Sequence, residues 1–132
     1  IVFNCLWLWD LGRRIEQVMG HLNMFMLFLV IAVVSNTSQF AFGGGGLFGG
    51  MSGVVFAYLG YCMVWDRLRP KEKIGLAPAA YWVMLGFLAL GFTGLLDLLG
   101  LGALANGAHL GGLLAGAVIA LLAPFLVRKR VL

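Results

Sequence analysis

The stretch that decides the fold runs from Ala105 to Val127 and reads ANGAHLGGLLAGAVIALLAPFLV, with His109 as its only ionisable residue. A helix needs about 20 predominantly apolar residues to cross a hydrocarbon core of about 30 Å, so this stretch predicts a membrane-spanning helix. Outward from it, the chain holds four more apolar segments, at about residues 1–12, 22–40, 52–65 and 78–96. The fold class expected is an all-α membrane protein.

The composition of the whole chain points the same way. Of 132 residues, 62% are hydrophobic and 11% are charged, against about 45–50% and about 25% in a typical soluble domain. A soluble protein of this size has too little interior to bury so much apolar surface. The composition therefore argues against soluble enzymes, disordered tails and nucleic-acid binders, and the net charge of +4 calls for no nucleic-acid partner.

The basic residues predict the orientation of the segments. The loops at 38–51 and 97–106 contain no Lys or Arg, whereas all nine basic residues follow the first, third and fifth segments. Five successive crossings would put these groups and the C-terminus on one face, which the positive-inside rule assigns to the cytoplasm. The groups are Arg13 and Arg14; Arg67, Arg69, Lys71 and Lys73; and Arg128, Lys129 and Arg130.

The first segment begins inside an apolar run. Residue 1 is an Ile, with no initiator Met, no charged region before the run and no small-residue cleavage site, so the run does not fit a signal peptide. We therefore expect a fragment that lacks at least one upstream span.

A glycine-rich loop precedes the third segment. Six of the eight residues from Gly43 to Gly50 are glycines, which do not form a stable helix, so we expect the loop to dip inward and place Ser52 at a helix start facing a wet cavity. One interpretation makes Ser52 an N-cap. The other makes it a nucleophile, because a helix N-terminus offers free N–H donors for an oxyanion. Gly50 and Gly53 would let a substrate backbone come close.

His109 lies about one turn into the fifth segment. An ionisable residue within a span suggests a functional site, although a histidine bonded within the bundle is the alternative. Small residues at helical spacing let transmembrane helices approach closely, and two stripes of them predict contact between the third and fifth segments, with Ser52 and His109 at similar depth. The stripes are Gly53, Ala57 and Gly60, and Gly112 and Gly116.

The sequence offers a Ser–His dyad better than a triad, because no acidic residue is placed to serve as a third member. In such a dyad His109 must be neutral to accept the Ser52 proton. Asn4 is either a bundle-facing polar residue or a side-chain donor to an oxyanion. With no Cys-x-x-Cys, His-Glu-x-x-His or phosphate-binding Gly-Lys motif, we expect no metal and no cofactor.

Two strings resemble the rhomboid family of intramembrane serine proteases, bacterial type. They are Gly50-Met51-Ser52-Gly53-Val54-Val55-Phe56-Ala57 and Ala105-Asn106-Gly107-Ala108-His109-Leu110-Gly111-Gly112, which Gly116 continues. The resemblance covers essentially residues 1–132. It implies one peptidase domain, truncated at its N-terminus, with five of the six helices of a rhomboid-like bundle, in the bacterial inner membrane.

The resemblance also implies roles for residues. Ser52 is the nucleophile and His109 the general base, while the oxyanion hole uses the Ser52 N–H, the Asn4 side chain and a His just before residue 1. Phe56 stands where the family usually has a Tyr that stacks on the catalytic His. Gly50, Met51 and Gly53 flank the nucleophile. The substrates implied are transmembrane or juxtamembrane segments of other proteins, and the alternative is a non-catalytic relative that binds client helices.

Overall fold

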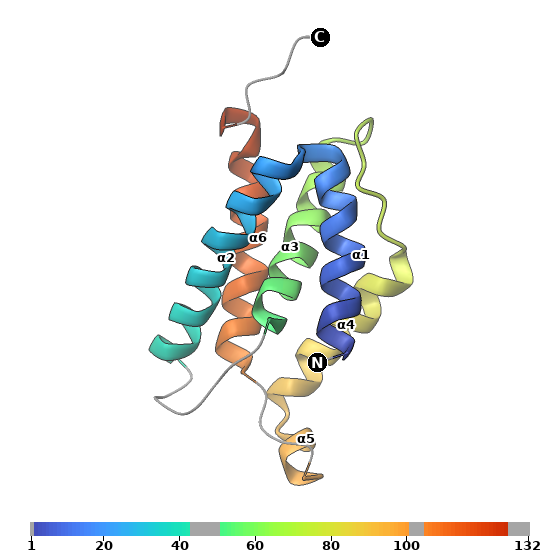
Figure 1. Cartoon of the computed structure of the whole chain (residues 1–132). Coiled ribbons are helices and arrows are strands. Elements are labelled where there is room, and N and C mark those ends of the chain that lie inside the picture. The colour runs from blue at the N-terminus through green and yellow to red at the C-terminus, as the bar shows by residue number, and fades with distance from the viewer. Residues whose placement is uncertain (1, 43–50, 101–104, 127–132) are drawn as a thin grey trace.

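The computed structural model describes residues 2–42, 51–100 and 105–126, with side chains described as far as Ala123. The predicted glycine-rich loop at 43–50, including Gly50, and the basic group at Arg128–Arg130 lie outside the described residues. The described part is helical and contains no strand, which confirms the all-α prediction (Figure 1). Its helices are α1 (Val2–Met19), α2 (His21–Phe42), α3 (Ser52–Leu68), α4 (Pro78–Phe92), α5 (Leu95–Leu98) and α6 (Asn106–Leu126).

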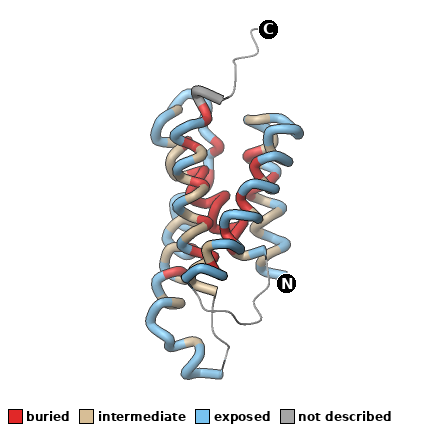
Figure 2. The backbone as a smooth tube through the Cα atoms, turned by 90° about the vertical axis from the view of Figure 1, so that its left-hand side faces the viewer, coloured by how far each residue is buried: buried red, intermediate tan, exposed pale blue. Residues whose placement is uncertain are grey.

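The core of the bundle is α3. Every residue from Gly53 to Cys62 is buried, and Figure 2 shows the buried positions gathered between the surrounding helices. Those helices bury only a narrow face and leave many large apolar side chains exposed, among them Leu6, Val33 and Val118. In a membrane protein this exposed apolar surface faces lipid.

Glycines bring α3 and α6 into backbone contact. A Cβ atom added to Gly112 would overlap the carbonyl oxygen of Gly53, and one added to Gly116 would overlap that of Ala57. From the other side, a Cβ on Gly60 would overlap the carbonyl oxygen of Leu113. The two helices therefore approach as closely as their main chains allow, along the faces that carry the two small-residue stripes.

A second glycine face of α6 packs on α2. A Cβ on Gly111 would overlap the Ser38 side chain, and one on Gly107 would lie 2.9 Å from Gln39 Oε1. This contact between α6 and α2 was not predicted from the sequence. Because two faces of α6 carry glycines, the helix fits between α2 and α3 with its main chain close to both.

Two described helices are long and apolar enough to cross a membrane by length and composition, α2 and the part of α6 from Asn106 to Ala123. The other segments meet this test less well for visible reasons. The 18-residue helix α1 carries four charged residues between Asp10 and Glu16, and α3 has 17 residues. The helix α4 ends at Phe92, before the end expected at residue 96, because Gly94 adopts φ +69° and turns the chain into α5.

Candidate active site

Ser52 is the first residue of α3. Met51 occupies the N-cap position with φ −87°, and the Val55 N–H donates to the Met51 carbonyl oxygen at 3.0 Å. The amides of Ser52 and Gly53 therefore precede the first hydrogen bond of the helix. Ser52 does not hold the N-cap position that one interpretation of the sequence gave it.

The Ser52 hydroxyl contacts His109. His109 Nε2 lies 2.8 Å from Ser52 Oγ, within hydrogen-bond distance. His109 occupies the first turn of α6 and is 2% exposed, whereas Ser52 is half-buried. The short α3–α6 spacing, with Gly112 against the Gly53 carbonyl group, is what lets these two short side chains meet.

Phe56 lies one turn beyond Ser52 on α3, and its ring packs against the His109 imidazole. The Phe56 and His109 ring centroids are 4.7 Å apart and the ring planes are inclined by 38°. His109 Nδ1 is buried and has no hydrogen-bond partner within the described part of the chain. The His109 ring is thus oriented by packing against Phe56 on one side and by contact with Ser52 on the other. No third polar residue among those described takes part.

Two polar residues of α2 contact the residues next to His109 and Ser52, and they were not predicted from the sequence. Gln39 is 8% exposed, and its Oε1 accepts a hydrogen bond from the Ala108 N–H at 3.0 Å, one residue before His109. Ser35 is 2% exposed and packs against Gly53, one residue after Ser52. They are the two ends of Ser35-Asn36-Thr37-Ser38-Gln39, a run of consecutive polar residues at the end of an otherwise apolar segment. That run was a usable signal, because polar residues of a span favour contact with protein over lipid.

Asn4 lies in the first turn of α1 and is half-buried. In Figure 1 this end of α1 lies at the same end of the bundle as the starts of α3 and α6. Among the described residues no hydrogen bond joins Asn4 to Ser52 or His109. The neighbouring Phe3 ring contacts Phe87 of α4, with centroids 5.8 Å apart, so this end of α1 also touches α4. Met51 is exposed.

A cavity of about 540 Å³ opens beside the site, between α2, α6 and the end of α4. It is lined on the α6 side by Gly107, Leu110, Gly111 and Leu114, whereas His109 and Gly112 face α3. The cavity is therefore separated from the Ser52–His109 pair by the α6 main chain.

Comparison with known proteins gives the family. A family model described as the rhomboid domain matches residues 1–124. The chain belongs to the rhomboid family. Relatives named rhomboid protease GlpG are 36% identical over 126 residues in Photorhabdus laumondii, 38% over 120 residues in Serratia proteamaculans, and 36% over 125 residues in Yersinia pestis.

These relatives are longer than the chain. The alignments cover 91–92% of this chain but 41% of each rhomboid relative. The chain thus spans about two fifths of the length of the curated relatives it matches, and this part includes the Ser52–His109 pair.

Proposed function

We propose that the protein is an intramembrane serine endopeptidase in which Ser52 is the nucleophile and His109 the general base. The observation that carries this proposal is the 2.8 Å contact between Ser52 Oγ and His109 Nε2, at the adjoining ends of two helices packed main chain to main chain. A nucleophile within hydrogen-bond reach of a base, with the base oriented by a third group, is the arrangement that activates a serine. Here Phe56 provides the orientation.

The reaction follows from this arrangement. His109 carries its proton on Nδ1, so Nε2 accepts the Ser52 proton while Oγ forms a bond to the scissile carbonyl carbon. As the tetrahedral intermediate collapses, the C–N bond breaks and the His109 imidazolium returns the proton to the leaving amine. Water then attacks the acyl-enzyme with His109 again as base, which releases the second product and restores Ser52.

The oxyanion of the intermediate needs donors that are already oriented. The Ser52 N–H is one, because it lies before the first hydrogen bond of α3 and at the positive end of the helix dipole. We assign the Asn4 side chain as a second donor. Its position at the same end of the bundle as Ser52 and His109 supports this role.

The substrates proposed are transmembrane or juxtamembrane segments of other proteins in the bacterial inner membrane. The described basic residues Arg13, Arg14, Arg67 and Arg69 lie toward the ends of α1 and α3 remote from Asn4 and Ser52. By the positive-inside rule their end faces the cytoplasm, which puts the Ser52–His109 pair toward the outer leaflet.

Fluorophosphonate labelling of the protein in detergent tests the nucleophile. We expect one adduct on the wild-type chain, located by mass spectrometry at Ser52, and none on the Ser52→Ala variant. Labelling that survives Ser52→Ala would disprove the assignment. A wild-type protein that takes no label would favour the alternative of a rhomboid relative that binds client helices without cleaving them.

The Phe56 ring should contribute a smaller, measurable part of the rate. Aromatic contacts are worth about 0.5–1.5 kcal/mol beyond area burial, which corresponds to a loss of about 2- to 13-fold on Phe56→Leu. The measurement is the second-order rate of Ser52 labelling. Phe56→Tyr keeps the ring and serves as the matched control. Equal rates for the wild-type and Leu proteins would show that His109 is oriented without the ring.

A further inference from the structure

The connection between α3 and α4 is fastened to the rest of the bundle at Gly75. The Asp66 carboxylate, in the last turn of α3, accepts hydrogen bonds from the Ile74 N–H at 2.6 Å and the Gly75 N–H at 3.1 Å. Gly75 adopts φ +76°, a conformation that favours glycine. One carboxylate therefore holds two successive amides of the connection.

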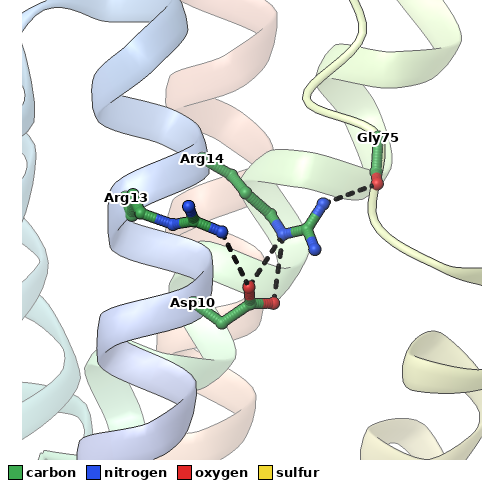
Figure 3. Close-up of polar contacts among 4 residues, drawn as sticks. All are labelled: Asp10, Arg13, Arg14 and Gly75. Atoms are coloured by element: carbon green, nitrogen blue, oxygen red, sulfur yellow. Dashed lines mark hydrogen bonds and ion pairs between the residues drawn. The ribbon is translucent and has the colours of Figure 1, made fainter.

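The carbonyl group of the same Gly75 is held from a different helix. Arg14 of α1 donates from Nη1 to the Gly75 carbonyl oxygen at 3.0 Å, while its Nε donates to both carboxylate oxygens of Asp10, at 3.0 and 3.1 Å. Figure 3 shows Arg14 reaching from α1 across to Gly75, with Asp10 beneath it. We call Asp10, Arg14, Asp66 and the Gly75 main chain the Gly75 clasp.

The clasp is not explained by the stability of α3 itself. A carboxylate in the last turn of a helix opposes the helix dipole, so Asp66 is placed against local preference and is compensated by the two amides it binds. Hydrogen bonds with one charged partner are roughly twice as strong as neutral ones. The clasp thus joins α1, α3 and the connection through bonds of the stronger kind, at the end of the bundle remote from Ser52.

The helix that follows the clasp is held weakly along its length. Met84 and Leu88 are the buried residues of α4, and Trp82 and Val83 are largely exposed. Near its far end, the Gly91 carbonyl oxygen accepts a neutral hydrogen bond from Asn106 Nδ2 at 2.8 Å. Asn106 lies one turn before His109, so the far end of α4 is bonded to the start of the helix that carries His109.

We propose that the Gly75 clasp fixes where α4 begins, and that Asp66 and Arg14 are positioning residues that set how α4 lies beside the Ser52–His109 pair. Gly75 is followed by Leu76, which is buried, and within three residues by Pro78, whose fixed φ begins α4. Because so few residues separate the clasp from α4, we expect loss of the clasp to change where the far end of α4 lies. The link to substrate entry rests on the proposed function.

Distances measured by pulsed electron paramagnetic resonance test the proposal in the protein reconstituted in liposomes. One spin label is placed on the native exposed Cys5 of α1 and the other on Ala89→Cys near the far end of α4, with buried Cys62 changed to Ala. Asp66→Asn removes the charge and one of the two acceptor oxygens that bind the connection, and Arg14→Gln removes the guanidinium that reaches Gly75. Glu72→Gln is the matched control, because it removes one charge from the same connection at an exposed side chain.

We expect the Cys5–Ala89 distance distribution to broaden and shift in Asp66→Asn and in Arg14→Gln and to match the wild type in Glu72→Gln. A second pair, Cys5 with Val118→Cys on α6, reports on the rest of the bundle and should stay unchanged. An unchanged Cys5–Ala89 distribution would overturn the proposal. So would an equal change in both pairs, since it would mean that the clasp stabilises the whole bundle rather than α4.

The same variants connect the clasp to activity. Loss of a charge-assisted bond should raise the fraction of molecules in which α4 is displaced by about 10- to 150-fold. Cleavage of a transmembrane substrate should therefore change markedly, whereas labelling of Ser52 by a small fluorophosphonate should stay near the wild-type rate. An equal change in both rates would contradict the positioning role. If the wild type takes no label, the proposed function fails while the distance measurement still decides the clasp.

Discussion

His109→Asn should lower the rate of Ser52 labelling by a fluorophosphonate by about 10²- to 10⁴-fold, the usual contribution of a general base. The serine hydroxyl is a weak nucleophile until a base takes its proton, and His109 Nε2, at 2.8 Å, is within hydrogen-bond reach of Ser52 Oγ. Asn retains a polar side chain but has no basic nitrogen. The measurement is the second-order labelling rate, followed by the fluorescence of the adduct.

The other histidine provides the control. His21 lies on α2, is exposed, and contacts Glu16 at the opposite end of the bundle. His21→Asn should label at the wild-type rate. A labelling rate of His109→Asn within about tenfold of the wild-type rate would be a smaller loss than a general base contributes. It would mean that another group activates Ser52 and that the dyad is wrong.

Gly116→Ala should destabilise the bundle by more than its one added methyl group suggests. The new Cβ would overlap the Ala57 carbonyl oxygen, which is main chain and cannot move aside as a flexible side chain would. Overpacking of this kind costs about 1–3 kcal/mol, occasionally more, and we expect the upper part of that range. Thermal unfolding in detergent micelles measures the loss, and Ser52 labelling should fall with it because the α3–α6 spacing changes.

Gly86→Ala is the matched control, because the same substitution there should have the opposite sign. Gly86 lies within α4, and no atom of the described residues lies within 4 Å of the position a Cβ would take. Removing a glycine from a helix interior stabilises by about 0.5–1 kcal/mol. If Gly116→Ala and Gly86→Ala shift the unfolding temperature alike, close backbone packing does not hold α3 against α6.

The parts of the fold that follow from local pattern could be predicted from the sequence. Long apolar runs indicate helices, and the run from Ala105 contains a helix from Asn106. The two small-residue stripes led to an expected contact between the third and fifth segments, and in the structure Gly112 and Gly116 lie against Gly53 and Ala57. Family membership was expected from the strings around Ser52 and His109, and the rhomboid match confirms it.

The contacts that could not be predicted join residues far apart in the sequence, where no helical spacing relates one residue to the other. The clasp joins Arg14 to a residue 61 positions later, and Gln39 binds the amide of Ala108, 69 positions later. Neither partner can be identified from the sequence, because a guanidinium or a side-chain amide that binds a main-chain group leaves no mark on the partner's side chain. The end of α4 at Phe92 was missed for a different reason, since Gly94 is one glycine among many and only its positive φ reveals the turn.

The two glycine faces of α6 have a consequence for how the protein can be altered. The register of His109 against Ser52 is set by the close approach of the α6 main chain to the main chain of α3 on one side and to Ser38 and Gln39 of α2 on the other. Side chains on the lipid-facing surfaces of α1, α2 and α4 contribute little to that register. An engineer adapting the protein to a thicker or thinner bilayer could therefore vary those exposed positions widely among apolar residues while leaving the glycines and the Ser52–His109 geometry untouched.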